Sequence, residues 1–247
     1  MGTVLIDNLL DVDIIAKKLY NKYIIPGVGI TINACCISQW RLNMEIKFDS
    51  KELSVLTRAE IAKEISSAGA LMVLAKDDEI IVRRAVAEIN GHVPAGVLNL
   101  LATDNSVDVR RSVTASKNAT KEILITLSTD EEVSVRYGVA LNENTPEYIL
   151  RKLSEDDNVR EAVAMNKNTT AELLQSMSKD KNEEVRYAVA RNKNTTAEVL
   201  HTLSKDKSAN VRSAVALNNN VSIKTLKNLL KDEDENIRSI VIGVLKI

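Results

Sequence analysis

The sequence predicts an all-α fold: a right-handed α-solenoid of about seven to eight two-helix repeats of 24–27 residues, preceded by a small N-terminal α+β module. The first observation is a phrase that occurs seven times, in which Val or Ile is followed by Arg, two further residues and Val. Successive arginines lie 27, 26, 24, 26, 26 and 26 residues apart. A fixed period of this size is typical of repeats that bury their apolar faces only by stacking. The arginines are Arg83, Arg110, Arg136, Arg160, Arg186, Arg212 and Arg238.

The second observation is a pair of apolar residues, three positions apart, in the second half of each repeat. This spacing places both members on one side of a helix, so that stacked repeats share one apolar core. Fully burying a side chain of this kind contributes roughly 1.5–3 kcal/mol. The pairs are Leu71/Leu74, Leu98/Leu101, Leu124/Leu127, Leu150/Leu153, Leu174/Met177, Leu200/Leu203 and Leu226/Leu229.

Within one repeat the elements follow in a regular order. Residues 185–190 carry apolar side chains at helical spacing and predict the first helix. Residues 192–194, Asn-Lys-Asn, end it, because Asn tolerates the left-handed conformation of helix ends. Thr195 and Glu198 predict a capping box, in which the hydroxyl and the carboxylate each bind a free amide at the start of the second helix. A degenerate first repeat is expected to begin near Arg58.

Residues 1–56 do not follow the period and form a predicted capping or docking domain ahead of the helical repeat array of residues 57–247. A helix is expected over residues 9–23, followed by a hairpin of strands over residues 28–38 and 42–48. We expect this module to cap the exposed end of the array. The alternative is that its strand edge pairs with a partner or with a second copy.

The repeat resembles a known family. Residues 185–206 read Val-Arg-x-x-Val-Ala-x-Asn-x-Asn-Thr-x-x-x-x-Leu-x-x-Leu-Ser-x-Asp, which is similar to the leucine-rich-repeat variant family and to shortened HEAT-like repeats. The resemblance covers residues 58–247. Members of the variant family can carry an N-terminal cysteine cluster that holds an iron–sulfur centre, which needs about four thiolates. Cys35 and Cys36 supply two, so a centre here would need thiolates from another subunit. HEAT-like arrays also include DNA glycosylases of the alkylpurine type, which makes nucleic acid the alternative ligand.

Composition excludes several classes of protein. The chain carries 33 Lys and Arg against 34 Asp and Glu, and the repeat region is no more basic than the rest, which argues against a general polyanion binder. No run of 18 apolar residues occurs, so no membrane span is expected. Without a secretion signal at its start, the chain is expected to be cytoplasmic. Its richness in Asn and Lys indicates an AT-rich genome, as in bacteria or phages.

An aspartate accompanies each recurring arginine, six residues before it in six repeats and four residues before Arg160 in the short one. At a constant offset, guanidinium and carboxylate groups can form charge-assisted bonds between successive repeats, and we favour this structural role. The alternative is a set of arginines that binds the phosphates of a nucleic acid. The candidate phosphate-binding residues are Arg84, Arg110, Arg111, Arg136 and Arg186.

Asparagines recur in two columns. We favour turn chemistry and helix capping as their role, because Asn side chains readily bind nearby backbone groups. The alternative is that they bind the backbone of a neighbouring repeat. The columns are Asn142, Asn166, Asn192 and Asn218, and Asn118, Asn144, Asn168, Asn194 and Asn220.

The positions that vary within this fixed frame carry the candidate binding site. One column follows each arginine and another lies four residues further on, a spacing that places both on one side of the first helix. In the middle of the array they hold residue types that are enriched at protein interfaces. The alternative is that the aliphatic members complete the packing between helices. The predicted partner-binding residues are Tyr137, Leu141, Met165, Tyr187, Arg191 and Leu217.

Patterns of catalysis and metal binding are weak. His92 and His201 lack neighbouring ligand residues, and the Cys35–Cys36 pair lies in an apolar stretch that is typical of a core. Residues 27–29, Gly-Val-Gly, are too short for a phosphate loop. We therefore predict a non-enzymatic scaffold without cofactor, metal or small-molecule substrate, whose partner is another protein. Nucleic acid is the second choice.

Overall fold

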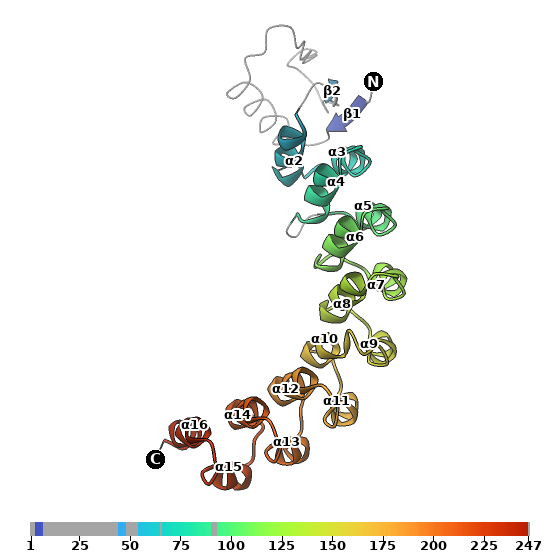
Figure 1. Ribbon diagram of the computed structural model, residues 1–247. Helices are drawn as coiled ribbons and strands as arrows, with labels where there is room; N and C mark the ends of the chain where they lie inside the picture. Colours follow the sequence, from blue (N-terminus) through green and yellow to red (C-terminus); the bar gives the residue numbers. More distant parts are fainter. Residues whose placement is uncertain (1–2, 7–43, 48–53, 65, 90–92, 247) are drawn as a thin grey trace, which may run out of the picture. The chain divides into compact units, whose positions relative to one another are not determined.

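The computed structural model describes residues 3–6, 44–47, 54–64, 66–89 and 93–246, which form fifteen helices and a pair of strands (Figure 1). The chain divides into two compact units, residues 1–127 and residues 128–247. Each unit consists mainly of stacked helix pairs, as the period of the sequence predicts. No helix in the described ranges is both long and apolar enough to cross a membrane.

Unit 1 combines a small sheet with the first repeats. Strand β1 (Thr3–Ile6) pairs antiparallel with β2 (Met44–Lys47) and contacts α3. Strand β2 lies within the predicted strand over residues 42–48, but its described partner is β1 and not the predicted strand over residues 28–38. The predicted helix over residues 9–23 and strand over residues 28–38 lie outside the described residues. The helices are α2 (Val55–Glu64), α3 (Ala68–Leu74), α4 (Ile80–Ala87), α5 (Ala95–Leu101), α6 (Val107–Thr114) and α7 (Lys121–Leu127).

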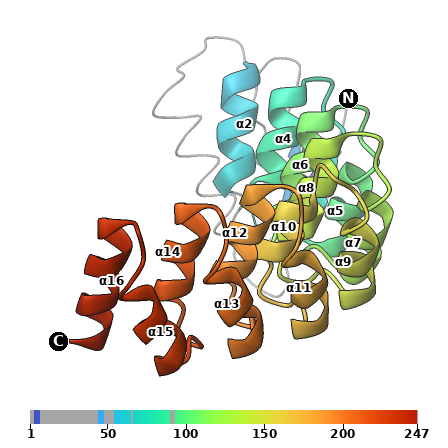
Figure 2. The ribbon, with the colours of Figure 1, turned by 60° about the horizontal axis from the view of Figure 1, so that its bottom comes forward.

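Unit 2 holds the remaining repeats. Its first helices pack on one another in one row and its second helices form another row, and the first row lies on the inner side of the curve of this unit (Figures 1 and 2). The first helices are α8 (Val133–Leu141), α10 (Arg160–Met165), α12 (Glu183–Arg191), α14 (Ala209–Leu217) and α16 (Glu235–Leu245). The second helices are α9 (Glu147–Leu153), α11 (Ala171–Met177), α13 (Ala197–Leu203) and α15 (Ile223–Leu229).

The predicted core is confirmed. The recurring valine before each arginine and the paired leucines of the second helices are buried, with Val185 and Leu200 as typical examples. Leu124, Leu150 and Leu174 are likewise fully removed from solvent. Since each repeat supplies only a few such residues, stacking is what allows them to be buried.

Arginine–aspartate pairs join successive repeats, as predicted. Arg186 donates from Nε and Nη2 to the carboxylate of Asp206, at 2.6 and 3.0 Å. Its Nη1 donates to the carbonyl of Asp180, six residues earlier, at 2.8 Å. The aspartate carboxylate thus binds the arginine of the preceding repeat, while its carbonyl binds the arginine of its own repeat. The pairs are Arg58–Asp77 and Arg83–Asp104 in unit 1, and Arg136–Asp156, Arg160–Asp180, Arg186–Asp206 and Arg212–Asp232 in unit 2. The Arg58 pair confirms the degenerate first repeat.

The short repeat departs from this pattern. Arg160 binds Asp180 through Nη1 at 2.8 Å and also contacts Asp157. Its Nε is buried without a hydrogen-bond partner. Two residues are missing before this arginine, so α10 begins at Arg160 itself, whereas α12 begins three residues before Arg186.

The arginine–aspartate pairs form one ladder of contacts between repeats, and the asparagines form a second ladder within unit 2. This finding corrects the preference for turn chemistry and helix capping as the role of the asparagines. The buried Asn192 donates from Nδ2 to the carbonyls of Ala164 and Asn166, at 2.7 and 2.9 Å, and its Oδ1 accepts the amide of Asn194. Asn166 and Asn218 repeat this arrangement. The same side chain therefore shapes its own turn and binds the preceding repeat.

The predicted helix boundaries are wrong in two details. Asn192 ends α12 in an extended conformation (φ −69°, ψ 133°), not a left-handed one, because its side chain is anchored in the ladder. Thr196, one residue after the predicted cap, is the N-cap of α13, where its hydroxyl accepts the Val199 amide at 3.4 Å. The buried Thr195 instead donates its hydroxyl to the carbonyl of Val189 and joins the two helices of the repeat.

Candidate functional site

The predicted partner-binding residues lie on consecutive first helices of unit 2. Leu141, Met165 and Leu217 are 40%, 53% and 62% exposed, so they do not complete the packing between helices. Each is at or near the last residue of its helix, in α8, α10 and α14. Together with Tyr137, Tyr187 and Arg191 they define what we call the first-helix face.

The two tyrosines of this face are half-buried. Burial, and then the negative charge of Glu161 on the neighbouring helix, raise the pKa of Tyr137. Its phenol therefore stays protonated and available as a hydrogen-bond donor at neutral pH. Each ring presents an apolar body with a polar tip, which suits a surface that meets both water and a partner.

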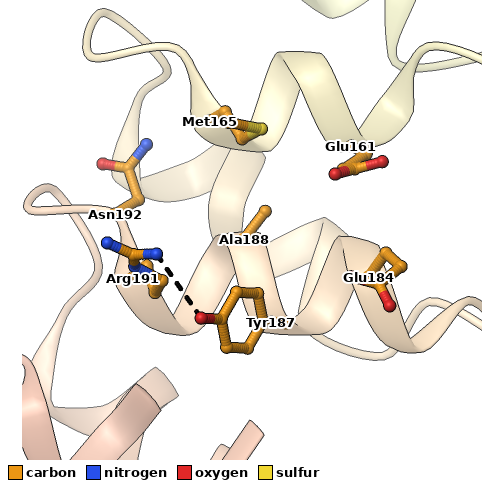
Figure 3. Close-up of a pocket in the computed structure, with 7 residues that line it drawn as sticks. All are labelled: Glu161, Met165, Glu184, Tyr187, Ala188, Arg191 and Asn192. Carbon is orange, nitrogen blue, oxygen red and sulfur yellow. Dashed lines mark hydrogen bonds between the residues drawn. The ribbon is translucent and has the colours of Figure 1, made fainter. Parts of the chain in front are cut away.

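A pocket of about 310 Å³ lies between α10 and α12 (Figure 3). Three predicted residues, Met165, Tyr187 and Arg191, line it. Tyr137, Leu141 and Leu217 lie on the same face but outside the pocket. The remaining lining residues are Glu161, Glu184, Ala188 and Asn192.

The pocket is electrostatically polarised. Glu161 and Glu184 lie at one end and Arg191 at the other (Figure 3). The Arg191 guanidinium carbon is 5.7 Å from the centroid of the Tyr187 ring, and its Nη1 donates to the phenol oxygen at 3.4 Å. Neither glutamate side chain has an ion pair or a hydrogen bond with any described residue.

The column pattern of the sequence predicts the apolar and aromatic side of this pocket but not its acidic end. A signal for Glu184 is present, because it precedes Tyr187 by three residues and so shares its helical face. Glu161 occupies the same column as Tyr187 one repeat earlier. Their proximity depends on how α10 packs against α12, which the local pattern does not contain.

The arginines considered as phosphate ligands are already engaged. Arg136 and Arg186 are held by Asp156 and Asp206. Arg110 donates to the carbonyls of Asp104 and Asn105. Arg84 lies beside Glu88, and Arg111 beside Asp108, on the surface of unit 1. The contacts of Arg110, Arg136 and Arg186 argue against a phosphate-binding role for these three, because such a site needs cationic groups that are free to exchange counterions. The pairs of Arg84 and Arg111 are exposed and weak, so their role as phosphate ligands stays a prediction.

Among the residues that the structure describes, the other candidate groups form no metal site. His201 contacts the hydroxyl of Thr225 at 3.2 Å. Within the described ranges, no three His, Cys, Asp or Glu side chains gather in a way that would hold a metal ion. His92 and the Cys35–Cys36 pair lie outside these ranges.

The fold and the face define the class of protein: a helical repeat protein. The chain is similar to a solved leucine-rich repeat variant with a novel repetitive structural motif, at 29% identity over 78% of this chain and 77% of that one, with a TM-score of 0.58. It is also similar to YibA of E. coli, at 21% identity over 77% of this chain and 86% of that one, with a TM-score of 0.49. The first similarity confirms the resemblance inferred from the repeat. No protein-family model and no curated protein matches the chain.

Proposed function

We propose that this protein is a non-enzymatic repeat scaffold that binds a partner protein through the first-helix face of unit 2. The observation that carries the proposal is the exposure of Leu141, Met165 and Leu217 beside two half-buried tyrosines. Exposed apolar side chains that recur on one row of helices are candidates for an interaction site, because folded domains rarely leave large apolar patches uncovered. Tyr, Met and Arg are also the residue types that protein interfaces favour.

The ladders support this proposal because they hold the face in place. Arg186 and Asn192 bind both their own repeat and a neighbouring one within unit 2. A face prepared in this way loses little conformational entropy on binding, which increases the affinity that a given contact area yields.

The lining of the pocket also supports a binding role. Met165, Tyr187 and Ala188 lie between carboxylates at one end and Arg191 at the other (Figure 3). Such a lining, aromatic and apolar with a few polar groups at the ends, is typical of recognition sites.

The test is affinity capture from host lysate with the parent protein, with Tyr137→Ala plus Tyr187→Ala, and with Tyr148→Ala. Tyr148 is the matched control, because it is exposed in the same unit but lies on the second helix α9. We expect the double variant to lose partners that the control retains. Equal capture by all three proteins would refute the proposal, and capture that disappears after nuclease treatment would favour the nucleic-acid alternative.

A further inference from the structure

We infer that the pocket between α10 and α12 receives a Lys or Arg side chain from an extended segment of the partner, with its cation held between Glu161 and Glu184. This inference rests on the proposed function and names the chemistry of the partner at that face.

The acidic end of the pocket is complementary in charge to a basic side chain. The two carboxylates come from different helices, lie at the same end of the pocket and have no cationic partner among the described residues (Figure 3). The recurring aspartates between repeats of this unit, such as Asp206 and Asp232, are paired with arginines. A ligand cation would complete at Glu161 and Glu184 the pairing that these aspartates already have.

The wall of the pocket has a shape and polarity that suit a long basic side chain. Met165, Tyr187 and Ala188 form an apolar surface beside the carboxylates. The aliphatic stem of Lys or Arg packs well on such a surface while its charged end reaches a polar group. The volume of the pocket, about 310 Å³, lies at the low end of the range for ligand pockets and suits one long side chain.

Arg191 can bind the backbone of the partner's segment. Arg191 uses Nη1 for its bond to Tyr187, and its other nitrogens have no acceptor among the described residues. They are therefore able to donate to a carbonyl group of a segment that crosses the face. Backbone carbonyls that become buried need such a donor.

The flanking leucines predict the pattern of the segment. Leu141 of α8 and Leu217 of α14 lie on opposite sides of the pocket along the row of first helices. Each is one and a half helix-to-helix spacings from the middle of the pocket. Packed helices lie roughly 8–10 Å apart, so each of these distances is about 14 Å. An extended chain covers that distance in about four residues and returns its side chains to the same face at every second position. The expected pattern is apolar-x-x-x-basic-x-x-x-apolar.

The experiment uses three fluorescein-labelled peptides of the form Leu-Ser-Thr-Ser-X-Ser-Thr-Ser-Leu, in which X is Arg, Gln or Glu, and measures binding by fluorescence polarisation. We expect the Arg peptide to bind at least about tenfold more tightly than the Gln peptide, because hydrogen bonds to charged groups contribute that much or more. The Glu peptide should bind more weakly still.

Two variants locate the effect. Glu161→Gln plus Glu184→Gln should abolish the preference for Arg, with the helical circular dichroism unchanged. Glu131→Gln plus Glu155→Gln is the control, since it removes the same charge at exposed turns of the same unit and should keep the preference. The inference is overturned if no peptide binds, if all three bind equally, or if the first variant retains the preference.

Failure of this inference is distinguishable from failure of the proposed function. A partner captured in a tyrosine-dependent manner, whose binding is unchanged by Glu161→Gln plus Glu184→Gln, would retain the first-helix face and discard the basic side chain. Loss of tyrosine dependence would discard the face itself.

Discussion

The substitution Asp206→Ala tests whether the arginine–aspartate pairs hold the repeats together. In the parent protein the Arg186 and Asp206 side chains are 7% and 9% exposed, and two hydrogen bonds join them. Removal of Asp206 leaves the charge of Arg186 buried without its counter-ion. It also removes the acceptor of the Ser208 amide.

The magnitude follows from this burial. Removing one member of a buried ion pair costs about 3–5 kcal/mol, and the small residual exposure favours the lower part of that range. We expect Asp206→Ala to reduce the free energy of unfolding by about 3 kcal/mol. Asp156→Ala provides the comparison, because Asp156 and its partner Arg136 are 24% and 18% exposed. Solvent screening should limit its cost to about 1–2 kcal/mol.

The assay is urea unfolding at pH 7, followed by circular dichroism at 222 nm. Hydrogen exchange then locates the weakened region, which should include α12 and α14, since a repeat contacts only its neighbours. The double variant Arg186→Met plus Asp206→Ala should cost less than the sum of its two single changes, because no charge stays buried. If Asp206→Ala costs no more than Asp156→Ala, burial does not determine the strength of these pairs and the reasoning fails.

Three further predictions concern the same framework. The hydrogen bond from Arg212 lowers the pKa of Asp232 below its ordinary 3.8. The contribution of the ionised Asp232 to stability should therefore be complete above that pH and should be lost as the pH falls through the lowered pKa. Acid unfolding of Asp232→Asn should lack this component. Asn192→Ala should cost about 2–4 kcal/mol in urea unfolding, because it deprives the buried Ala164 carbonyl and the Asn194 amide of their side-chain partner and removes one of the two donors to the Asn166 carbonyl. By contrast, exposed Asn219→Ala should stay within about 0.5 kcal/mol. Insertion of Glu-Glu between Asn158 and Val159 restores the usual spacing of six residues between the aspartate and the arginine of the repeat. It should raise the melting temperature, because the buried Nε of Arg160 lacks a hydrogen-bond partner in the short repeat. A lower melting temperature would show that the short repeat is adapted to its own geometry.

The repeat and its core were predictable because both depend on local periodicity. A spacing of 24–27 residues with leucines three apart is enough to define helix pairs that must stack. The pairing of arginine with aspartate was also predictable as a class of contact. Its direction was not, because the offset between stacked repeats decides that Arg186 binds the carboxylate of Asp206 and only the carbonyl of Asp180.

The asparagine ladder and the pocket were likewise predictable only in part, as far as local spacing along one helix determines them. Column spacing on the first helix identified Met165 and Tyr187 from the sequence. Only the packing of α10 against α12 brought Glu161 and Glu184 to one end of a shared pocket, and only stacking placed Asn192 against the carbonyl of Ala164. Helical period determines which side chains share a face of one helix. Contacts between helices of different repeats depend on their distance and offset, which the whole stack of apolar side chains determines together.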